Sequence, residues 1–75
     1  MKAKMFLISF FFNGEPHSLQ TYKLFTLKDL IKFFDYKENL IVLEYNGKIT
    51  NPKNWSLINL KNQDKVEILT IVGGG

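Results

Sequence analysis

Two residues, Asn13 and Gly14, commit the first third of this chain to a tight turn between two strands. Both central positions of a two-residue hairpin turn need positive φ, and Asn-Gly is the pair that tolerates it best. An aromatic and apolar run, residues 4–12, precedes the turn, and residues 15–22 follow it. The pattern predicts a β-hairpin. Because Pro16 has no amide hydrogen to give to a strand ladder, its strand is expected at an edge of the sheet.

The clearest periodic segment begins at Thr26, which is a good N-cap residue. Asp29 follows three residues later and can complete a capping box in which Asp replaces Glu. Four apolar residues then share one face of a helix, because they are spaced by three or four positions. They are Leu27, Leu30, Ile31 and Phe34. We predict one amphipathic helix whose apolar face packs on the core.

The second half of the chain predicts two more strands. Residues 40–46 are strongly apolar and end at a second Asn-Gly pair, and residues 65–72 form the last strand. Between them, residues 48–55 predict a loop that is broken by a proline, and residues 62–64 predict a turn. The inward face of the last strand is expected to comprise Val66, Ile68 and Val72. One end of the core is expected to be closed by Trp55, Leu57, Ile58 and Leu60.

The order of these elements is hairpin, helix, strand, loop and strand. A mixed sheet of four to five strands, with one main helix packed across it, buries one sheet face and one helix stripe economically. This order resembles the α+β arrangement of β-grasp, ubiquitin-like proteins. We assign residues 1–72 to one such domain and residues 73–75, all glycine, to a flexible C-terminal tail.

Composition narrows the classes of function. The chain has no cysteine, which excludes thiolate chemistry, Cys-ligated zinc and a side-chain persulfide, and favours a reducing intracellular setting. Ten lysines and no arginine give a net charge of +3, but they are scattered among acidic residues, so no nucleic-acid partner is expected. The apolar run near the start is far shorter than the ~20 residues that span a bilayer, so no membrane partner is expected.

The excess of Lys, Asn, Ile and Phe over Arg and Ala is typical of AT-rich coding. It predicts an AT-rich bacterium or an organelle genome. The expected location is therefore the cytoplasm, or the plastid stroma if the gene lies in the organelle.

Few side chains qualify for catalysis. His17 is the one histidine and is expected to be exposed and idle, because no further ligands have metal-site spacing. No phosphate-binding glycine motif is present. The remaining candidates are isolated and are interpreted as ordinary surface residues: Ser9, Ser18, Ser56, Glu15, Glu44 and Glu67. The chain is therefore not expected to be an enzyme, nor to bind a metal or a cofactor of its own.

The glycine tail has two explanations. Termini fray, and glycines can be merely flexible. Alternatively, the tail presents its α-carboxylate to a partner: three residues beyond Val72 reach about 10 Å when extended, and glycine, without a Cβ, fits a narrow channel. The carboxylate is ionised at pH 7 and can attack an activated phosphate.

The sequence resembles the ThiS family of sulfur carriers over residues 10–75. The resemblance lies in the two Asn-Gly turns and in the start of the helix, residues 26–30; the second turn, Asn46-Gly47, is followed by Pro52 and Trp55. The most specific part of the resemblance is the run from Asp64 to Ile68 together with the run from Val72 to Gly75. In the family, Gly75 would be adenylated by a ThiF-type activating enzyme that consumes ATP. A cysteine desulfurase relay would then convert it to a thiocarboxylate.

The same resemblance implies the further partners and residues. Thiazole synthase (ThiG) would accept the sulfur while it builds the thiazole ring of thiamine. Gly74 corresponds to an essential spacer, and Gly73 to a less strict third glycine. A MoaD-type carrier for molybdopterin, a ubiquitin-like protein modifier and a plain interaction module are the alternatives. The short connection of about five residues between Asp35 and Ile41 favours the ThiS type over the longer MoaD type.

Two features depart from the family. Gln63 stands before Asp64, where members usually have glycine, which affects the expected geometry of that turn. The first strand is also longer, by about four residues, and is rich in Phe and Leu. We hypothesise that surplus apolar side chains on the exposed strand face form a docking surface for partners.

Overall fold

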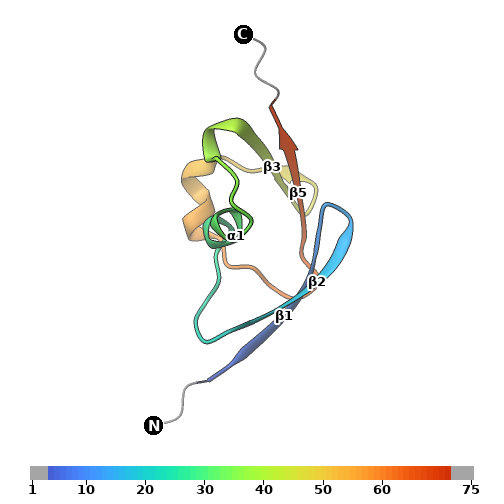
Figure 1. Ribbon diagram of the computed structural model, residues 1–75, viewed down its shortest axis with the longest axis vertical. Helices are drawn as coiled ribbons and strands as arrows, with labels where there is room; N and C mark the ends of the chain where they lie inside the picture. Colours follow the sequence, from blue (N-terminus) through green and yellow to red (C-terminus); the bar gives the residue numbers. More distant parts are fainter. Residues whose placement is uncertain (1–3, 72–75) are drawn as a thin grey trace.

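The computed structural model describes residues 4–71. A hairpin comes first, then a helix, and three further strands follow with two short 3₁₀ helices among them (Figure 1). The elements are β1 (Phe6–Phe12), β2 (Glu15–Thr21), α1 (Leu27–Phe33), η1 (Glu38–Leu40), β3 (Ile41–Tyr45), β4 (Lys48–Ile49), η2 (Pro52–Leu57) and β5 (Lys65–Thr70). No helix within this part of the chain is long and apolar enough to cross a membrane.

The strands form one five-stranded sheet in the order β2-β1-β5-β3-β4. β1 and β5 run parallel and the other neighbours are antiparallel, so the sheet is mixed, with β5 at its centre. Helix α1 lies across one face (Figure 1). The predicted α+β fold is confirmed.

Strand β2 lies at the edge, as the proline predicted. Pro16 pairs with Phe11, whose amide donates to Asp64 O on the other side of β1 at 2.8 Å. Since backbone groups alternate along a strand, this is a pair that exchanges no hydrogen bond with β2. The missing amide hydrogen of proline therefore costs the ladder nothing.

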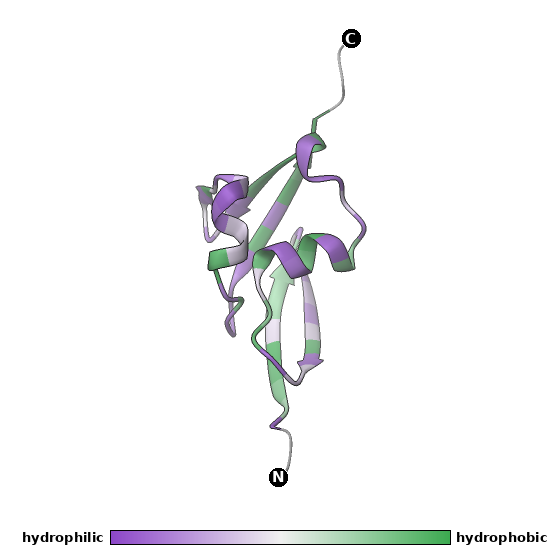
Figure 2. Ribbon diagram, turned by 90° about the vertical axis from the view of Figure 1, so that its left-hand side faces the viewer, coloured by the Kyte–Doolittle hydropathy of each residue, from purple (hydrophilic) through white to green (hydrophobic). Residues whose placement is uncertain are grey.

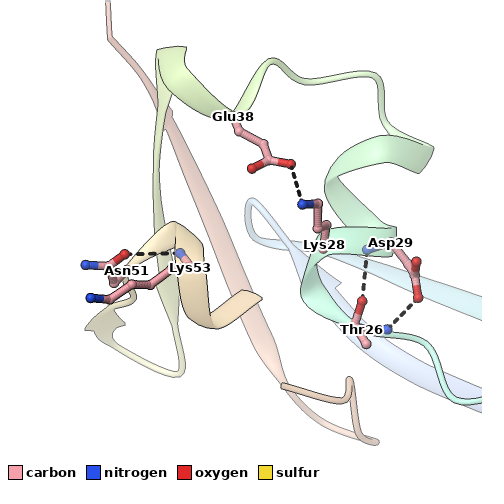
Figure 3. A network of polar contacts seen from close by, with 6 residues as sticks. All are labelled: Thr26, Lys28, Asp29, Glu38, Asn51 and Lys53. Carbon is pink, nitrogen blue, oxygen red and sulfur yellow. Dashed lines mark hydrogen bonds and ion pairs between the residues drawn. The ribbon is translucent and has the colours of Figure 1, made fainter. Parts of the chain in front are cut away.

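Helix α1 begins at the predicted cap. Thr26 Oγ1 accepts from the amide of Asp29 at 3.1 Å, and Asp29 Oδ2 accepts from the amide of Thr26 at 2.9 Å (Figure 3). Lys28 extends to Glu38 of η1, with 3.6 Å between Nζ and Oε2. The reciprocal cap fixes where the chain enters the helix, and the exposed ion pair adds little.

The helix ends in a Schellman motif. The amide of Tyr36 donates to Ile31 O, and that of Asp35 donates to Lys32 O, both at 3.0 Å. Asp35 occupies the left-handed position with φ of 61°. Glycine is the usual residue there, because a Cβ is disfavoured in this conformation.

We expect Asp35→Gly to raise the free energy of unfolding by about 1 kcal/mol, since it relieves the left-handed backbone and removes a negative charge at a helix C-terminus. Urea unfolding at neutral pH measures the change. Asp35→Ala is the matched control, because it removes the charge but keeps the Cβ. An equal gain in both variants would show that the left-handed backbone of Asp35 does not lower the free energy of unfolding.

The core lies between the inner sheet face and α1. Trp55 is fully buried and donates from Nε1 to Thr50 O at 3.0 Å, so its one polar atom is satisfied. Three of the four predicted helix residues are buried, and Phe34 is partly buried. The buried apolar residues are Ile8, Phe10, Phe12, Leu27, Leu30, Ile31, Ile41, Leu43, Trp55, Leu60, Val66 and Ile68.

The prediction of a loop over residues 48–55 is wrong in part. It contains β4, and Pro52 starts η2 rather than breaking structure, because proline suits the first helical position. Asn51 caps that helix by accepting from the amide of Lys53 at 3.1 Å (Figure 3).

Leu57 was predicted to close the core, and this is wrong: it is 76 % exposed. A 3₁₀ helix has three residues per turn, so Ile58 returns to the side of Trp55 while Leu57 turns outward. Trp55 and Leu60 are buried and Ile58 is partly buried, as predicted.

The prediction for His17 is also wrong. Its ring is half-buried and stacks on Phe10, with 5.7 Å between ring centroids, and Phe34 meets it edge-on at 5.6 Å. In β2 it faces the core side of the sheet opposite Phe10. The imidazole is therefore a packing residue of the hairpin rather than an idle surface group.

Candidate functional site

The candidate site begins where β5 ends. Thr70 pairs with Ile41, and the amide of Ile71 donates to Leu40 O at 2.7 Å. The chain is thus held by the sheet as far as Ile71, the last residue that the structure describes. Val72 and the predicted site residues Gly73, Gly74 and Gly75 lie outside the described residues, and their roles stay predictions.

The first hairpin turn anchors the middle of β5. Asn13 Oδ1 accepts from the amide of Ile68 at 2.7 Å, and the Asn13 amide donates to Val66 O at 2.9 Å. Asn13 has φ of 50°, as expected for the turn. The same residue therefore makes the hairpin and clamps β5, a long-range contact that no local sequence pattern predicts.

The start of β5 is fixed by the carboxylate of Asp64, which is 7 % exposed. Asp64 Oδ2 accepts from Tyr45 Oη at 2.6 Å and from the Lys61 amide at 2.8 Å, while Oδ1 accepts from Asn46 Nδ2 at 3.1 Å. Asn46 Oδ1 in turn accepts from the amide of Lys65 at 2.8 Å. We name Tyr45, Asn46 and Asp64 the carboxylate cluster; it fastens the β3–β4 turn to β5.

Burial, together with the hydrogen bond and the charge of Asp64, raises the pKa of Tyr45 from 10.0 to about 12. The folded state therefore favours the neutral phenol, and this stabilisation is present below pH 10 and is lost as the pH rises towards 12. We expect the stability difference between the native chain and Tyr45→Phe to shrink across this range. Urea unfolding of both chains at several pH values tests it; a constant difference would contradict the assignment.

The turn before Asp64 forms although glycine is absent. Gln63 takes φ of 71°, and its amide donates to Ser9 O at 2.7 Å. The departure from the family pattern therefore leaves the turn in place, with a left-handed glutamine instead of a glycine.

An apolar surface surrounds the end of β5 on the outer sheet face. Val42 lies directly opposite Leu69, and Ile49 of β4 is diagonal to Val42. Leu69 is 58 % exposed and Ile49 is 74 % exposed. We name this surface the outer apolar patch; it comprises Leu40, Val42, Ile49, Leu69 and Ile71.

Two carboxylates border the patch. Glu44 and Glu67 face each other across β3 and β5 in register. Like charges directly opposite on a sheet are unfavourable, so a cationic partner group would relieve them. Among residues 4–71, no group of three metal-ligating side chains gathers. Of the candidate serines, Ser9 and Ser18 pair across β1 and β2 with 3.5 Å between their hydroxyl oxygens.

The model of the ThiS family matches residues 11–75, which is most of the chain and includes the three glycines. The chain belongs to the ThiS family. This membership supports the predicted role as a sulfur carrier of thiamine biosynthesis, and as a small carrier protein rather than an enzyme.

Individual relatives agree with this family. The chain is 49% identical over 67 residues to ycf40, an uncharacterized protein of Trieres chinensis, with 89% of each chain covered. It is 35% identical to ycf40 of Porphyra purpurea, over 91% of this chain and 93% of that one. Relatives with this name are plastid-encoded in algae, which is consistent with the plastid, one of the two predicted locations.

The fold has a solved counterpart within the ThiS family. A crystal structure of the thiamine biosynthesis protein ThiS from Geobacter metallireducens superposes with a TM-score of 0.78. It covers 91% of this chain and 100% of that chain, at 22% identity. The similarity extends the β-grasp assignment to nearly the whole described chain.

Proposed function

We propose that the chain carries sulfur as a thiocarboxylate on Gly75 and donates it for formation of the thiazole ring of thiamine. The observation that carries the proposal is the end of β5: the central strand is fixed as far as Ile71, four residues before Gly75. A carboxylate that hangs from a fixed strand by a few small residues can be delivered to a partner's active site without disturbing the fold.

The chemistry is that of an acyl group activated in two steps. The Gly75 carboxylate oxygen attacks the α-phosphorus of ATP in a ThiF-type activating enzyme, and pyrophosphate leaves. The outer sulfur of a persulfide on the desulfurase relay then displaces AMP from the Gly75 acyl group and forms an acyl disulfide. A second thiol, the two-electron reductant, attacks the relay's own sulfur in that bond, so the thiocarboxylate is released on Gly75 and a disulfide remains on the relay. The chain has no cysteine, so the sulfur has no side-chain thiol of this protein to occupy. ATP is consumed by the partner and is not bound by this chain alone.

Gly74 and Gly73 are proposed to thread the activating site. A narrow channel excludes side chains, and Gly74, next to the reacting carboxyl, is expected to be stricter than Gly73. The plastid stroma is the proposed compartment, because the relatives named ycf40 are plastid-encoded.

The outer apolar patch is proposed as the surface on which the activating enzyme docks. It is continuous with the end of β5, so a partner seated on it would receive the tail directly. Exposed apolar residues grouped in this way mark interfaces. Glu44 and Glu67 would face basic groups of the partner.

We expect Leu69→Asp to weaken binding of the activating enzyme by about tenfold or more, since it places a charge at the centre of an apolar contact. The rate of adenylation as a function of carrier concentration measures it: KM should rise. Leu57→Asp is the control, because Leu57 is equally apolar and exposed on η2 but lies outside the patch. Equal effects of the two changes on KM would show that the activating enzyme does not dock on the outer apolar patch.

The carrier proposal is tested against its alternatives by the fate of the activated chain. The thiocarboxylate form is supplied to thiazole synthase with its other substrates, and in parallel to a molybdopterin synthase. Thiazole formation supports the proposal; transfer only to the molybdopterin precursor would assign the MoaD-type role. Conjugates on lysine side chains of other proteins would assign a modifier role instead.

A further inference from the structure

The first half of β1 has an open side. β5 pairs only with Phe11 and Phe12, because β5 begins at Lys65. Next along β1, the loop before β5 supplies the partners of Ser9: its amide donates to Asn62 Oδ1 at 2.8 Å, and its carbonyl accepts from the Gln63 amide at 2.7 Å.

Backbone groups alternate along a strand, so the amide and carbonyl of Leu7 point to the same side as those of Ser9 and Phe11. No residue between 4 and 71 makes a hydrogen bond to Leu7 on that side. An open strand edge is a template for another strand. Figure 2 shows that β1 is hydrophobic along most of its length, whereas β2 is mostly hydrophilic.

A groove of about 270 Å³ lies beside this edge. It is lined by residues 6–8 of β1, by residues 23–25 before the helix and by residues 60–62 before β5. Three consecutive residues of one strand can line a groove together only if the strand presents its backbone edge to it, because alternate side chains point to opposite faces. The groove therefore adjoins the open hydrogen-bonding groups of Leu7.

The groove is apolar with a basic rim. Leu7 is 57 % exposed and Leu24 is 63 % exposed. Lys23 and Lys61 line the groove, and Lys4 Nζ lies 5.7 Å from the centroid of the ring of Phe6, another lining residue. Of the residues that the structure describes, no carboxylate lines the groove. A second copy of this chain would bring lysines against lysines, so charge favours an acidic partner.

We propose that the open edge of β1 binds an extended peptide segment with alternating apolar and acidic residues, as an added strand. Main-chain hydrogen bonds to Leu7 would supply affinity, the groove would take an apolar side chain, and the lysines would select carboxylates. The start of β1 and the end of β5 lie at opposite ends of the molecule (Figure 1). A partner could therefore hold the chain here while the glycine tail is engaged elsewhere.

The test is an NMR titration of the ¹⁵N-labelled full chain with an acetylated, amidated heptapeptide in which Val alternates with Glu. We expect shifts confined to the groove residues and slowed hydrogen exchange of the Leu7 amide. The same peptide with Lys for Glu, and one with a central Pro, should not bind. Shifts at the outer apolar patch instead, or equal binding of the Pro peptide, would overturn the proposal.

Two variants of the chain complete the test. Lys61→Glu should weaken binding at least about fivefold, because it reverses a charge on the rim. Leu7→Pro should abolish binding, since it removes the backbone amide that donates to the peptide. The hairpin should tolerate this change, because the amide of Leu7, like the backbone nitrogen of Pro16, points away from the partner strand. Unchanged binding in Lys61→Glu would contradict the charge argument. Protection of Leu7 that rises with protein concentration without peptide would assign the edge to a second copy and overturn the proposal.

The outcome is independent of sulfur transfer. A chain without residues 73–75 should bind the heptapeptide as the full chain does, because the groove lies at the other end of the molecule. Loss of binding on that truncation would contradict the proposed location. Sedimentation of the chain with phosphatidylglycerol vesicles, in the absence of any peptide binding, would assign the lysines to a membrane surface and overturn the strand-addition proposal.

Discussion

Deletion of Gly75 is expected to abolish adenylation by the activating enzyme. The deletion moves the terminal carboxylate back by about 3.5 Å along an extended chain. A misplacement of only ~1 Å in a reacting group can cost about 10²-fold in rate, so a shift of a whole residue should leave no measurable activity. Release of pyrophosphate from ATP, with the activating enzyme and each carrier form, measures the loss.

The controls separate chemistry from stability. The free energy of unfolding should not change on deletion, because the last contact of the described sheet is the bond from the Ile71 amide to Leu40 O. Gly74→Ala should reduce adenylation more than Gly73→Ala, since it lies closer to the reacting carboxyl. Full adenylation of the deleted chain would show that Gly75 is not the acceptor.

Replacement of Asp64 by alanine is expected to lower the free energy of unfolding by about 3 kcal/mol. The carboxylate is buried and accepts three hydrogen bonds, and bonds to a charged group contribute about 1.5–3 kcal/mol each before solvent replaces part of the loss. A small domain has only about 5–15 kcal/mol to lose. Urea unfolding followed by tryptophan fluorescence measures it, because Trp55 is fully buried.

Asp64→Asn is the informative partner variant. An amide can replace only one of the two oxygens, so its NH₂ group would face either Tyr45 Oη and the Lys61 amide or the Asn46 amide nitrogen. We expect a smaller loss, about half that of alanine. A change of less than about 0.5 kcal/mol in Asp64→Ala would mean that the carboxylate cluster does not hold β5.

Local signals in the sequence predicted the elements that depend on local chemistry. The Asn13 turn, the Thr26 cap and the apolar face of α1 all follow from neighbours within four residues, and all three are present. The edge position of β2 followed from one missing hydrogen on Pro16.

The errors and omissions involve distant neighbours. The neighbours of His17 in the sequence predict an exposed side chain, yet Phe34, seventeen residues on, packs edge-on against its ring. The contacts of Asn13 with β5 and of Asp64 with Tyr45 join segments far apart in sequence. Leu57 was assigned to the core by hydropathy alone, without the three-fold repeat of a 3₁₀ helix.

The prediction of the site rests on family resemblance and on the lack of catalytic side chains, and it stays a prediction. No pattern of side chains points to Gly75, because the group proposed to react there is the chain terminus. The fold shows how the strand before the tail is fixed. Asn13 and Asp64 hold the central strand β5, and a hydrogen bond to Leu40 O holds its end.

The central claim is that Gly75 bears the sulfur, and the intact mass of the chain tests it most directly. The chain is incubated with ATP, a ThiF-type activating enzyme, a cysteine desulfurase with cysteine, and a thiol reductant that releases the thiocarboxylate from the persulfide relay, and its mass is compared before and after. The account predicts a gain equal to the difference between one sulfur and one oxygen atom, located on Gly75 by fragmentation. An unchanged mass with active partners, or a gain located on any other residue, would contradict it.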